Sequence, residues 1–297
     1  MNARLASFAG LLLSLLALNS AAESEPPTMS SVLAASSAAD WRQPDPENLL
    51  YLELASGRVI IELAPDFAPR HAANIRKLVR GDYFAGAQVL RVQENYVVQW
   101  GHADDKPLPP GAEARLAMET RQPVAAGQPF TALPDGDVYA AEVGFSQGFP
   151  VAGDPAGKQR WLAHCYAMVG VGRGMVADSG NGSSLYVVTG HAPRHLDLNI
   201  TLAGRVLHGM EHLTTLPRGS GALGFYEQPE QRVAILSTHL AADLPAAART
   251  QLEVLRTDTD SFRTLISARR HRHEAWFLDP VGRIGLCNMP VPVRILN

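Results

Sequence analysis

Two short runs of alternating apolar residues place the strongest constraint on how this chain folds. In residues 49–54, and again in residues 57–63, every second residue is apolar: Leu50, Leu52, Leu54, Val59, Ile61 and Leu63. Side chains that repeat every two residues lie on one face of a β-strand. Ser56-Gly57 stands between the runs and is typical of a tight turn. We therefore predict a β-hairpin with one buried face over residues 49–63.

Further strand-like runs recur along the chain, with little helical periodicity between them. They cover residues 87–92, 96–100, 165–169, 185–189, 201–207 and 232–238. Helical spacing begins at Pro69 and stops at Gly81, and residues 209–213 look like a short second helix. Many short strands with two helices predict a mainly β fold, namely a closed antiparallel β-barrel of about eight strands.

The barrel is expected to span residues 48–243, with other kinds of segment inside and around it. Residues 102–163 are rich in Pro and Gly and predict a long loop insertion with one or two short strands. Residues 23–47 are rich in Glu, Pro, Ser and Ala and predict a flexible linker. Residues 244–297 predict a small α+β C-terminal extension, with helices at 246–256 and 260–270 and a hairpin over 276–287.

The N-terminal residues have the layout of a secretory signal peptide. Arg4 precedes the apolar run from Leu5 to Leu18, and the small residues Ser20-Ala21-Ala22 follow it. A membrane anchor is the alternative, but this run of roughly 14 residues is shorter than the ~20 that span a bilayer. We therefore predict a signal peptide over residues 1–22, a periplasmic location and no stable membrane insertion.

Charge and cysteine content limit the partners and set the redox context. The formal net charge of −3 argues against nucleic acid as a partner, because phosphate binding needs a basic excess. The oligomeric state stays unknown. The two cysteines, Cys165 and Cys287, would meet an oxidising compartment after export, where a disulfide is possible. Two separate buried thiols remain the alternative.

Seven short motifs follow one another in order over residues 48–240. They lie at residues 57–63, 68–79, 81–86, 89–101, 167–168, 181–187 and 196–210. The fourth contains Val89-Leu90-Arg91-Val92 ahead of Tyr96-Val97-Val98-Gln99-Trp100-Gly101, and the sixth reads Asn181-Gly182-Ser183-Ser184-Leu185-Tyr186-Val187. This series resembles the cyclophilins, a family of peptidyl-prolyl cis-trans isomerases with a closed β-barrel.

The resemblance implies a catalytic residue and a substrate pocket. The catalytic arginine of the family falls on Arg91. The pocket positions fall on Tyr96, Val97, Gln99, Val169, Tyr186, Leu196 and Ile200. Four positions depart from the family. Ile200 stands where a histidine usually holds the substrate backbone, and His195 stands at a frequent Trp or Phe position. Leu90 replaces the histidine usually next to the catalytic arginine, and Ala203 replaces a usual core Phe.

The chemistry of proline isomerisation suits these residue types. Rotation about an X–Pro bond crosses a barrier of about 18–20 kcal/mol set by amide resonance, and lowering it requires no nucleophile, metal or cofactor. An apolar slot can hold the proline ring, and a fixed arginine can donate to the nitrogen of the twisted bond. We therefore expect an isomerase that assists the folding of exported proteins and binds proline-containing unfolded or extended polypeptides. The alternative is a cyclophilin-like binding or chaperone module with little turnover.

Overall fold

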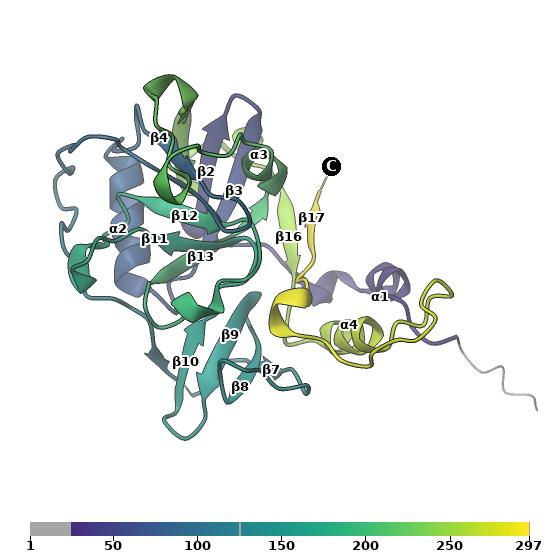
Figure 1. Cartoon of the computed structure of the whole chain (residues 1–297). Helices are drawn as coiled ribbons and strands as arrows, with labels where there is room; N and C mark the ends of the chain where they lie inside the picture. Colours follow the sequence, from purple (N-terminus) through teal and green to yellow (C-terminus); the bar gives the residue numbers. More distant parts are fainter. Residues whose placement is uncertain (1–24, 125, 297) are drawn as a thin grey trace, which may run out of the picture.

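A long antiparallel sheet, curled on itself, is the main structure within residues 48–240 (Figure 1). The computed structural model describes residues 25–124 and 126–296, so the predicted signal peptide lies outside the described residues. Within that part of the chain the sheet has nine strands, in the order β14-β4-β5-β12-β11-β13-β3-β2-β15. They are β2 (Leu49–Leu54), β3 (Gly57–Leu63), β4 (Gln88–Val92), β5 (Val97–Gly101), β11 (Met168–Val171), β12 (Leu185–Val188), β13 (Leu202–His208), β14 (Val233–Ala234) and β15 (Ser237–Leu240). The mainly β prediction is confirmed.

The sheet is a curled half-barrel rather than the closed barrel that we predicted. Its two end strands, β14 and β15, follow one another along the chain, separated only by Ile235 and Leu236. Ile235 N–H donates to Ala87 O beside β4, and Leu236 N–H donates to Glu53 O of β2. One continuous segment thus changes partner midway from β4 to β2. Because its halves lie end to end rather than side by side, no ladder closes the sheet among the described residues.

The predicted hairpin is formed by β2 and β3, but both of its faces are buried. Leu50 and Ile61 are 1% and 0% exposed in the main core of the curled sheet. On the opposite face Tyr51 and Ile60 are both 0% exposed and share a second apolar cluster with Val254, which lies far along the chain. The prediction of one buried face was wrong, because a distant segment covers the other face.

Two helices accompany the curled sheet, as predicted. Helix α2 (Pro69–Arg80) begins with proline at its first turn, where the missing N–H costs no hydrogen bond, and is followed by Gly81. Its inner face packs Ala72, Ile75 and Leu78 into the main core. Helix α3 (Met210–Thr214) is a single short turn after β13.

Residues 102–163 form a second sheet instead of a loop with one or two short strands. Among the described residues it has five strands, in the order β6-β10-β9-β8-β7. They are β6 (Gln122–Pro123), β7 (Thr131–Ala132), β8 (Glu142–Ser146), β9 (Phe149–Asp154) and β10 (Gln159–Leu162). Glycine obscured the pattern: a side chain at Gly144 would meet Thr131 O at 2.2 Å. Strands approach too closely there for a Cβ, so a residue typical of loops stands inside a strand.

The predicted flexible linker is also ordered in its described part. Residues 25–47 contain helix α1 (Met29–Ala35), capped by Thr28, and strand β1 (Trp41–Arg42). Trp41 is 8% exposed, and β1 pairs with β16 (Leu252–Leu255). The linker prediction was wrong because the few apolar residues of this segment find their partners more than 200 residues away, where no local pattern can indicate them.

The C-terminal segment differs from its prediction in two places. Helix α4 (Asp260–His271) lies where residues 260–270 predicted it. The expected helix at 246–256 is instead a short 3₁₀ turn followed by β16, because Leu252 and Val254 alternate as in a strand and pack against Tyr51. The expected hairpin at 276–287 is absent from the described residues, and the last strand is β17 (Val293–Ile295).

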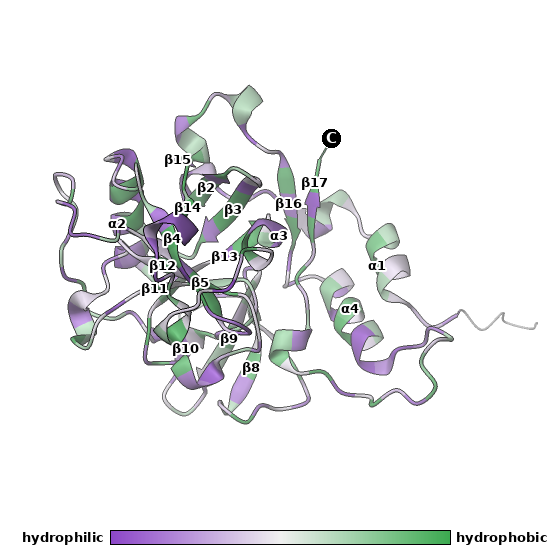
Figure 2. Cartoon of the chain, turned by 45° about the horizontal axis from the view of Figure 1, so that its top comes forward, coloured by the Kyte–Doolittle hydropathy of each residue, from purple (hydrophilic) through white to green (hydrophobic). Residues whose placement is uncertain are grey.

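The N-terminal segment, the insertion and the C-terminal segment share one apolar core. Val32 of α1, Phe145 of β8 and Phe262 of α4 belong to the same buried cluster. Helix α4 carries both hydrophobic and hydrophilic stretches, as an amphipathic helix packed on a core does (Figure 2). We call the structure built from these three segments the accessory unit. No helix within residues 25–124 and 126–296 has the length and apolarity that a membrane crossing needs.

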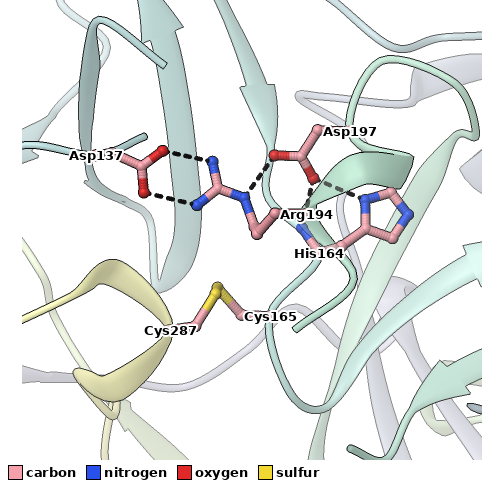
Figure 3. The surroundings of a disulfide bond; sticks show 6 residues. All are labelled: Asp137, His164, Cys165, Arg194, Asp197 and Cys287. Carbon is pink, nitrogen blue, oxygen red and sulfur yellow. Dashed lines mark hydrogen bonds and ion pairs between the residues drawn. A yellow bond between two sulfur atoms is a disulfide. The ribbon is translucent and has the colours of Figure 1, made fainter. Parts of the chain in front are cut away.

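A disulfide between Cys165 and Cys287 joins the curled sheet to the accessory unit (Figure 3). The two cysteines are 122 residues apart in the sequence, and Cys165 is 5% exposed. A second link is the ion pair between Arg42 of β1 and Glu62 of β3, with Nη1 and Oε1 2.6 Å apart. The accessory unit is thus held by a covalent bond, an ion pair and apolar packing.

Candidate active site

The Arg91 side chain is held by three acceptors on the outer face of β4. Its Nε donates to Leu223 O at 2.7 Å, its Nη1 donates to Gln99 Oε1 at 3.3 Å, and its Nη2 donates to Gln93 Oε1. Burial lowers the pKa of Arg91, but a guanidinium stays charged at neutral pH. The structure therefore presents a fixed, half-buried cation.

Gln99, on the neighbouring strand β5, is itself held in one orientation. Its Nε2 donates to Ser184 Oγ at 3.0 Å, and Ser184 Oγ donates to the carbonyl of Trp100 at 3.2 Å. With Nε2 turned toward Ser184, Oε1 faces Arg91 as an acceptor. The Gln99 amide, fixed through Ser184 to the backbone of β5, thus fixes the orientation of the Arg91 guanidinium.

A small apolar pocket of about 90 Å³ lies next to Arg91. Tyr96, Val97, Tyr186, Leu196 and Ile200 line it together with Gln99, Gly172 and Arg173. Val97 and Tyr186 are 2% and 5% exposed, and Tyr96 and Ile200 pack against them. A cation at the rim of an apolar slot is the arrangement expected for holding a proline ring beside a donor.

The structure brings seven of the eight predicted site residues together and leaves one out. Arg91, Tyr96, Val97, Gln99, Tyr186, Leu196 and Ile200 all line the pocket. Val169 does not: it is 0% exposed in the main core of the curled sheet. Side chains alternate along a strand, so Gly170, which pairs with Tyr186, lies on the pocket face and Val169 points inward.

A buried polar chain beneath the pocket was not predicted from the sequence. Figure 3 shows its members His164, Asp197, Arg194 and Asp137. The Tyr186 hydroxyl lies 2.9 Å from His164 Nε2, and His164 Nδ1 lies 2.9 Å from Asp197 Oδ1. Arg194 then donates from Nε to Asp197 Oδ2 at 2.6 Å and from Nη1 to Asp137 Oδ2 at 2.9 Å. Asp137, His164 and the segment that carries both Arg194 and Asp197 are far apart in the sequence, so no local motif indicates that they meet.

The electrostatics of this chain define its hydrogen-bond directions. Burial opposes ionisation of Asp197, but hydrogen bonds from His164 and the charge of Arg194 outweigh it and lower the pKa of that carboxyl group. Burial lowers the pKa of His164, which is therefore neutral at pH 7. The ionised Asp197 accepts from His164 Nδ1–H, so Nε2 is the acceptor and the Tyr186 O–H donates to it.

Comparison with known proteins agrees with this geometry. Residues 49–240 match the family of cyclophilin-type peptidyl-prolyl cis-trans isomerases/CLD. Probable peptidyl-prolyl cis-trans isomerases of Brucella suis and Brucella melitensis are each 28% identical over 178 residues, which cover 60% of this chain and 76% of theirs. The chain belongs to the cyclophilin family. It is a peptidyl-prolyl cis-trans isomerase.

A solved cyclophilin structure resembles more than the isomerase domain. The crystal structure of cyclophilin AquaCyp293 from Hirschia baltica superimposes with a TM-score of 0.69 at 26% identity. The match covers 91% of this chain and 97% of that one. Since the curled sheet with its insertion ends near residue 240, the similarity of this cyclophilin to AquaCyp293 also includes part of its flanking segments.

The rim of this cyclophilin's pocket carries two residues that the sequence marked as unusual and one that it missed. His195 is exposed and stacks on Tyr96, with ring centroids 6.4 Å apart and planes inclined by 2°. Ile200 adds an apolar wall in place of a donor. Arg173 was not predicted; it is exposed, and its Nε donates to Asn199 O at 3.1 Å.

Proposed function

We propose that the pocket holds the proline ring of an X–Pro segment and that Arg91 stabilises the twisted peptide bond. As the bond rotates, resonance is lost and the imide nitrogen gains a lone pair. A guanidinium fixed by Leu223 O and Gln99 Oε1 can donate to that lone pair without reorganising. The position of Arg91 at the rim of the apolar pocket is the observation that carries this proposal.

Gln99 and Tyr186 have supporting roles in this mechanism. Gln99 orients Arg91 and, at the pocket wall, is placed to contact the substrate backbone next to proline. Tyr186 offers its ring to the proline, while its hydroxyl is occupied by His164. Because the O–H already has an acceptor, the aromatic face can form part of an apolar wall without an unpaired polar group.

We infer further that the substrates are exported polypeptides that fold in the periplasm. The apolar run of residues 5–18, followed by Ser20-Ala21-Ala22, supports export of the chain. The disulfide between Cys165 and Cys287 is a bond that persists in oxidising compartments. When the gene is expressed in a Gram-negative host, protein recovered from the periplasm should begin at Glu23. Recovery from the cytoplasm with Met1 intact would contradict export.

A binding module with low turnover is the second candidate, favoured by one feature of the rim. Ile200 offers no hydrogen to a substrate carbonyl, and His195 replaces a larger aromatic side chain. Such a pocket could hold proline-containing segments while orienting them poorly for rotation. The two candidates predict different outcomes for Arg91→Ala. The mechanism proposed here predicts a large loss of turnover, whereas the binding module predicts none.

Protease-coupled isomerisation of an X–Pro peptide separates the two candidates. In the mechanism proposed here, Arg91→Ala lowers kcat/KM by about 10²–10³, the loss typical of one preorganised donor. Peptide affinity should change much less. The matched control is Arg263→Ala on α4, where an exposed arginine pairs with Asp260 far from the pocket. Equal turnover of wild type and a folded Arg91→Ala protein would overturn the mechanism and favour the binding module.

A further inference from the structure

A second groove, away from the isomerase pocket, lies where the accessory unit meets the curled sheet. It has a volume of about 620 Å³, is open to solvent, and runs beside the disulfide. The curled sheet contributes Val206 and Leu207, α3 contributes Met210, and the C-terminal segment contributes Met289, Val291 and Val293. These walls are apolar, but two arginines, Arg205 and Arg269, line the same groove.

Arg205 is a buried cation without hydrogen-bond partners for two of its nitrogens. It is 7% exposed, and its Nε and Nη2 are shielded from solvent with no acceptor among the described residues. Burial lowers the pKa of Arg205 to about 10, so the group still carries its proton at pH 7. A buried guanidinium without a partner destabilises the folded protein, and a bound anion would offset that destabilisation.

The nearest acid is already committed to another arginine. Glu62 faces Arg205, but both of its oxygens accept from Arg42, at 2.6 and 2.9 Å. Two cations therefore share one carboxylate, and a positive charge is left over at Arg205. The second arginine of the groove adds to it: Arg269 Nε is buried without an acceptor among the described residues. No Asp or Glu is among the described residues that line the groove.

We propose that this groove binds the apolar C-terminal end of a polypeptide, with the terminal carboxylate seated at Arg205 and Arg269. A carboxylate is planar and matches the fork of a guanidinium, and a charge-assisted contact would offset the positive charge left over at Arg205. The apolar walls fit hydrophobic side chains next to that terminus. The site is separate from the isomerase pocket and does not depend on the mechanism proposed for it.

A free strand edge favours a polypeptide as the source of the carboxylate. Among the described residues, β17 is the outer strand of the sheet β1-β16-β17. Leu255 N–H donates to Pro292 O, and Leu296 N–H donates to Gln251 O, so residues 292 and 296 face β16. By the alternation of antiparallel pairs, the backbone groups of Val293 point to the open edge. Val293 also lines the groove, so an extended chain there can pair with β17 as an added strand.

Binding to the full chain can be measured with a dye-labelled, proline-free peptide that ends in Leu-Val-Leu-Val with a free carboxylate. Absence of proline keeps the probe out of the isomerase pocket. We expect the same peptide with a C-terminal amide to bind about tenfold or more weakly, since one charge-assisted contact is lost. Arg205→Gln should lower the affinity for the carboxylate peptide by a similar factor, so that the variant binds the carboxylate and amide peptides equally. It should leave X–Pro isomerisation unchanged.

The control is Arg115→Gln, an exposed arginine with 65% of its side chain accessible and paired with Asp178 away from the groove. If Arg205→Gln does not fold, Arg269→Gln at the same groove gives the same comparison. Equal affinities for the carboxylate and the amide, or no effect of the groove variant that folds, would overturn the proposal. Displacement of the peptide by decanoate at lower concentration than by unlabelled peptide would assign the groove to small fatty carboxylates and also overturn it.

Discussion

The Nε2 atom of His164 lies 2.9 Å from the hydroxyl oxygen of Tyr186, directly beneath the isomerase pocket. This contact has one direction at neutral pH, because Asp197 takes the hydrogen on the other ring nitrogen. Three other groups act on His164: Asp197 favours its protonated form, while Arg194 and His195 oppose it. Burial outweighs the attraction of Asp197 and lowers the pKa of His164 below its ordinary value of 6.5.

Stability should decline when the pH falls below about 6.5. The pKa of His164 is lower in the folded than in the unfolded chain, so the unfolded chain binds more protons in this window. The stabilising contribution is therefore complete above pH 6.5 and is lost as the pH drops toward the folded value. Urea unfolding at pH 7.5 and 5.5 checks this prediction.

The control for this prediction is His164→Gln, which does not titrate and can still accept from Tyr186. The difference in free energy of unfolding between wild type and variant should be smaller at pH 5.5, because His164 contributes less stability there. A stability difference that stays constant across the two pH values would mean that folding does not lower the pKa of His164.

Ile200→His should strengthen substrate binding. Ile200 lines the pocket and is partly accessible, and an imidazole there adds a donor for the substrate carbonyl. One such hydrogen bond contributes about 1 kcal/mol, so KM for an X–Pro peptide should fall about fivefold. Ile200→Leu keeps the apolar wall and should leave KM nearly unchanged. A higher KM in Ile200→His would show that the substrate carbonyl lies elsewhere.

Gly170→Ala should damage the pocket from below. A Cβ at this position would lie 2.1 Å from Tyr186 Cζ and 2.2 Å from its hydroxyl oxygen. The ring cannot yield easily, because Tyr186 is 5% exposed and its hydroxyl is bonded to His164. Overpacking of this kind costs about 1–3 kcal/mol of stability. We expect a lower unfolding midpoint and a reduced kcat/KM, whereas Gly174→Ala, with Ser179 Oγ 3.6 Å away, should match wild type.

Removal of the disulfide should destabilise the chain strongly. Cys165 and Cys287 are 122 residues apart, and closing a loop of that length stabilises by up to about 5 kcal/mol in the chain-entropy description. The double variant Cys165→Ala/Cys287→Ala should unfold at lower denaturant concentration than oxidised wild type. Reductant should lower the unfolding midpoint of the wild type toward that of the variant and leave the midpoint of the variant unchanged. An effect of reductant on the variant would show that it acts at another site.

The site could be predicted where its residues share a strand or a short motif. Arg91 and Gln99 lie on adjacent strands only eight residues apart, within one motif that resembles the cyclophilins, and that resemblance identified both. Val169 was wrongly included because its neighbour Gly170, not Val169 itself, lies on the pocket face. Asp137 and His164 were missed because their partners, Arg194 and Asp197, lie in a segment far along the chain. A buried hydrogen bond between distant loops leaves no periodic signal.

The sequence by itself determined the hairpin at residues 49–63, helices α2 and α4, and most strands of the curled sheet, because burial of one face imposes a period of two or 3.6 residues. Only the tertiary structure decided that residues 25–47 and 102–163 would be ordered. Their apolar residues, Trp41 and Phe145 among them, become buried when the N-terminal segment, the insertion and the C-terminal segment pack into one core. Such burial depends on partners far along the chain, and it is therefore a property of the assembled fold rather than of any local stretch.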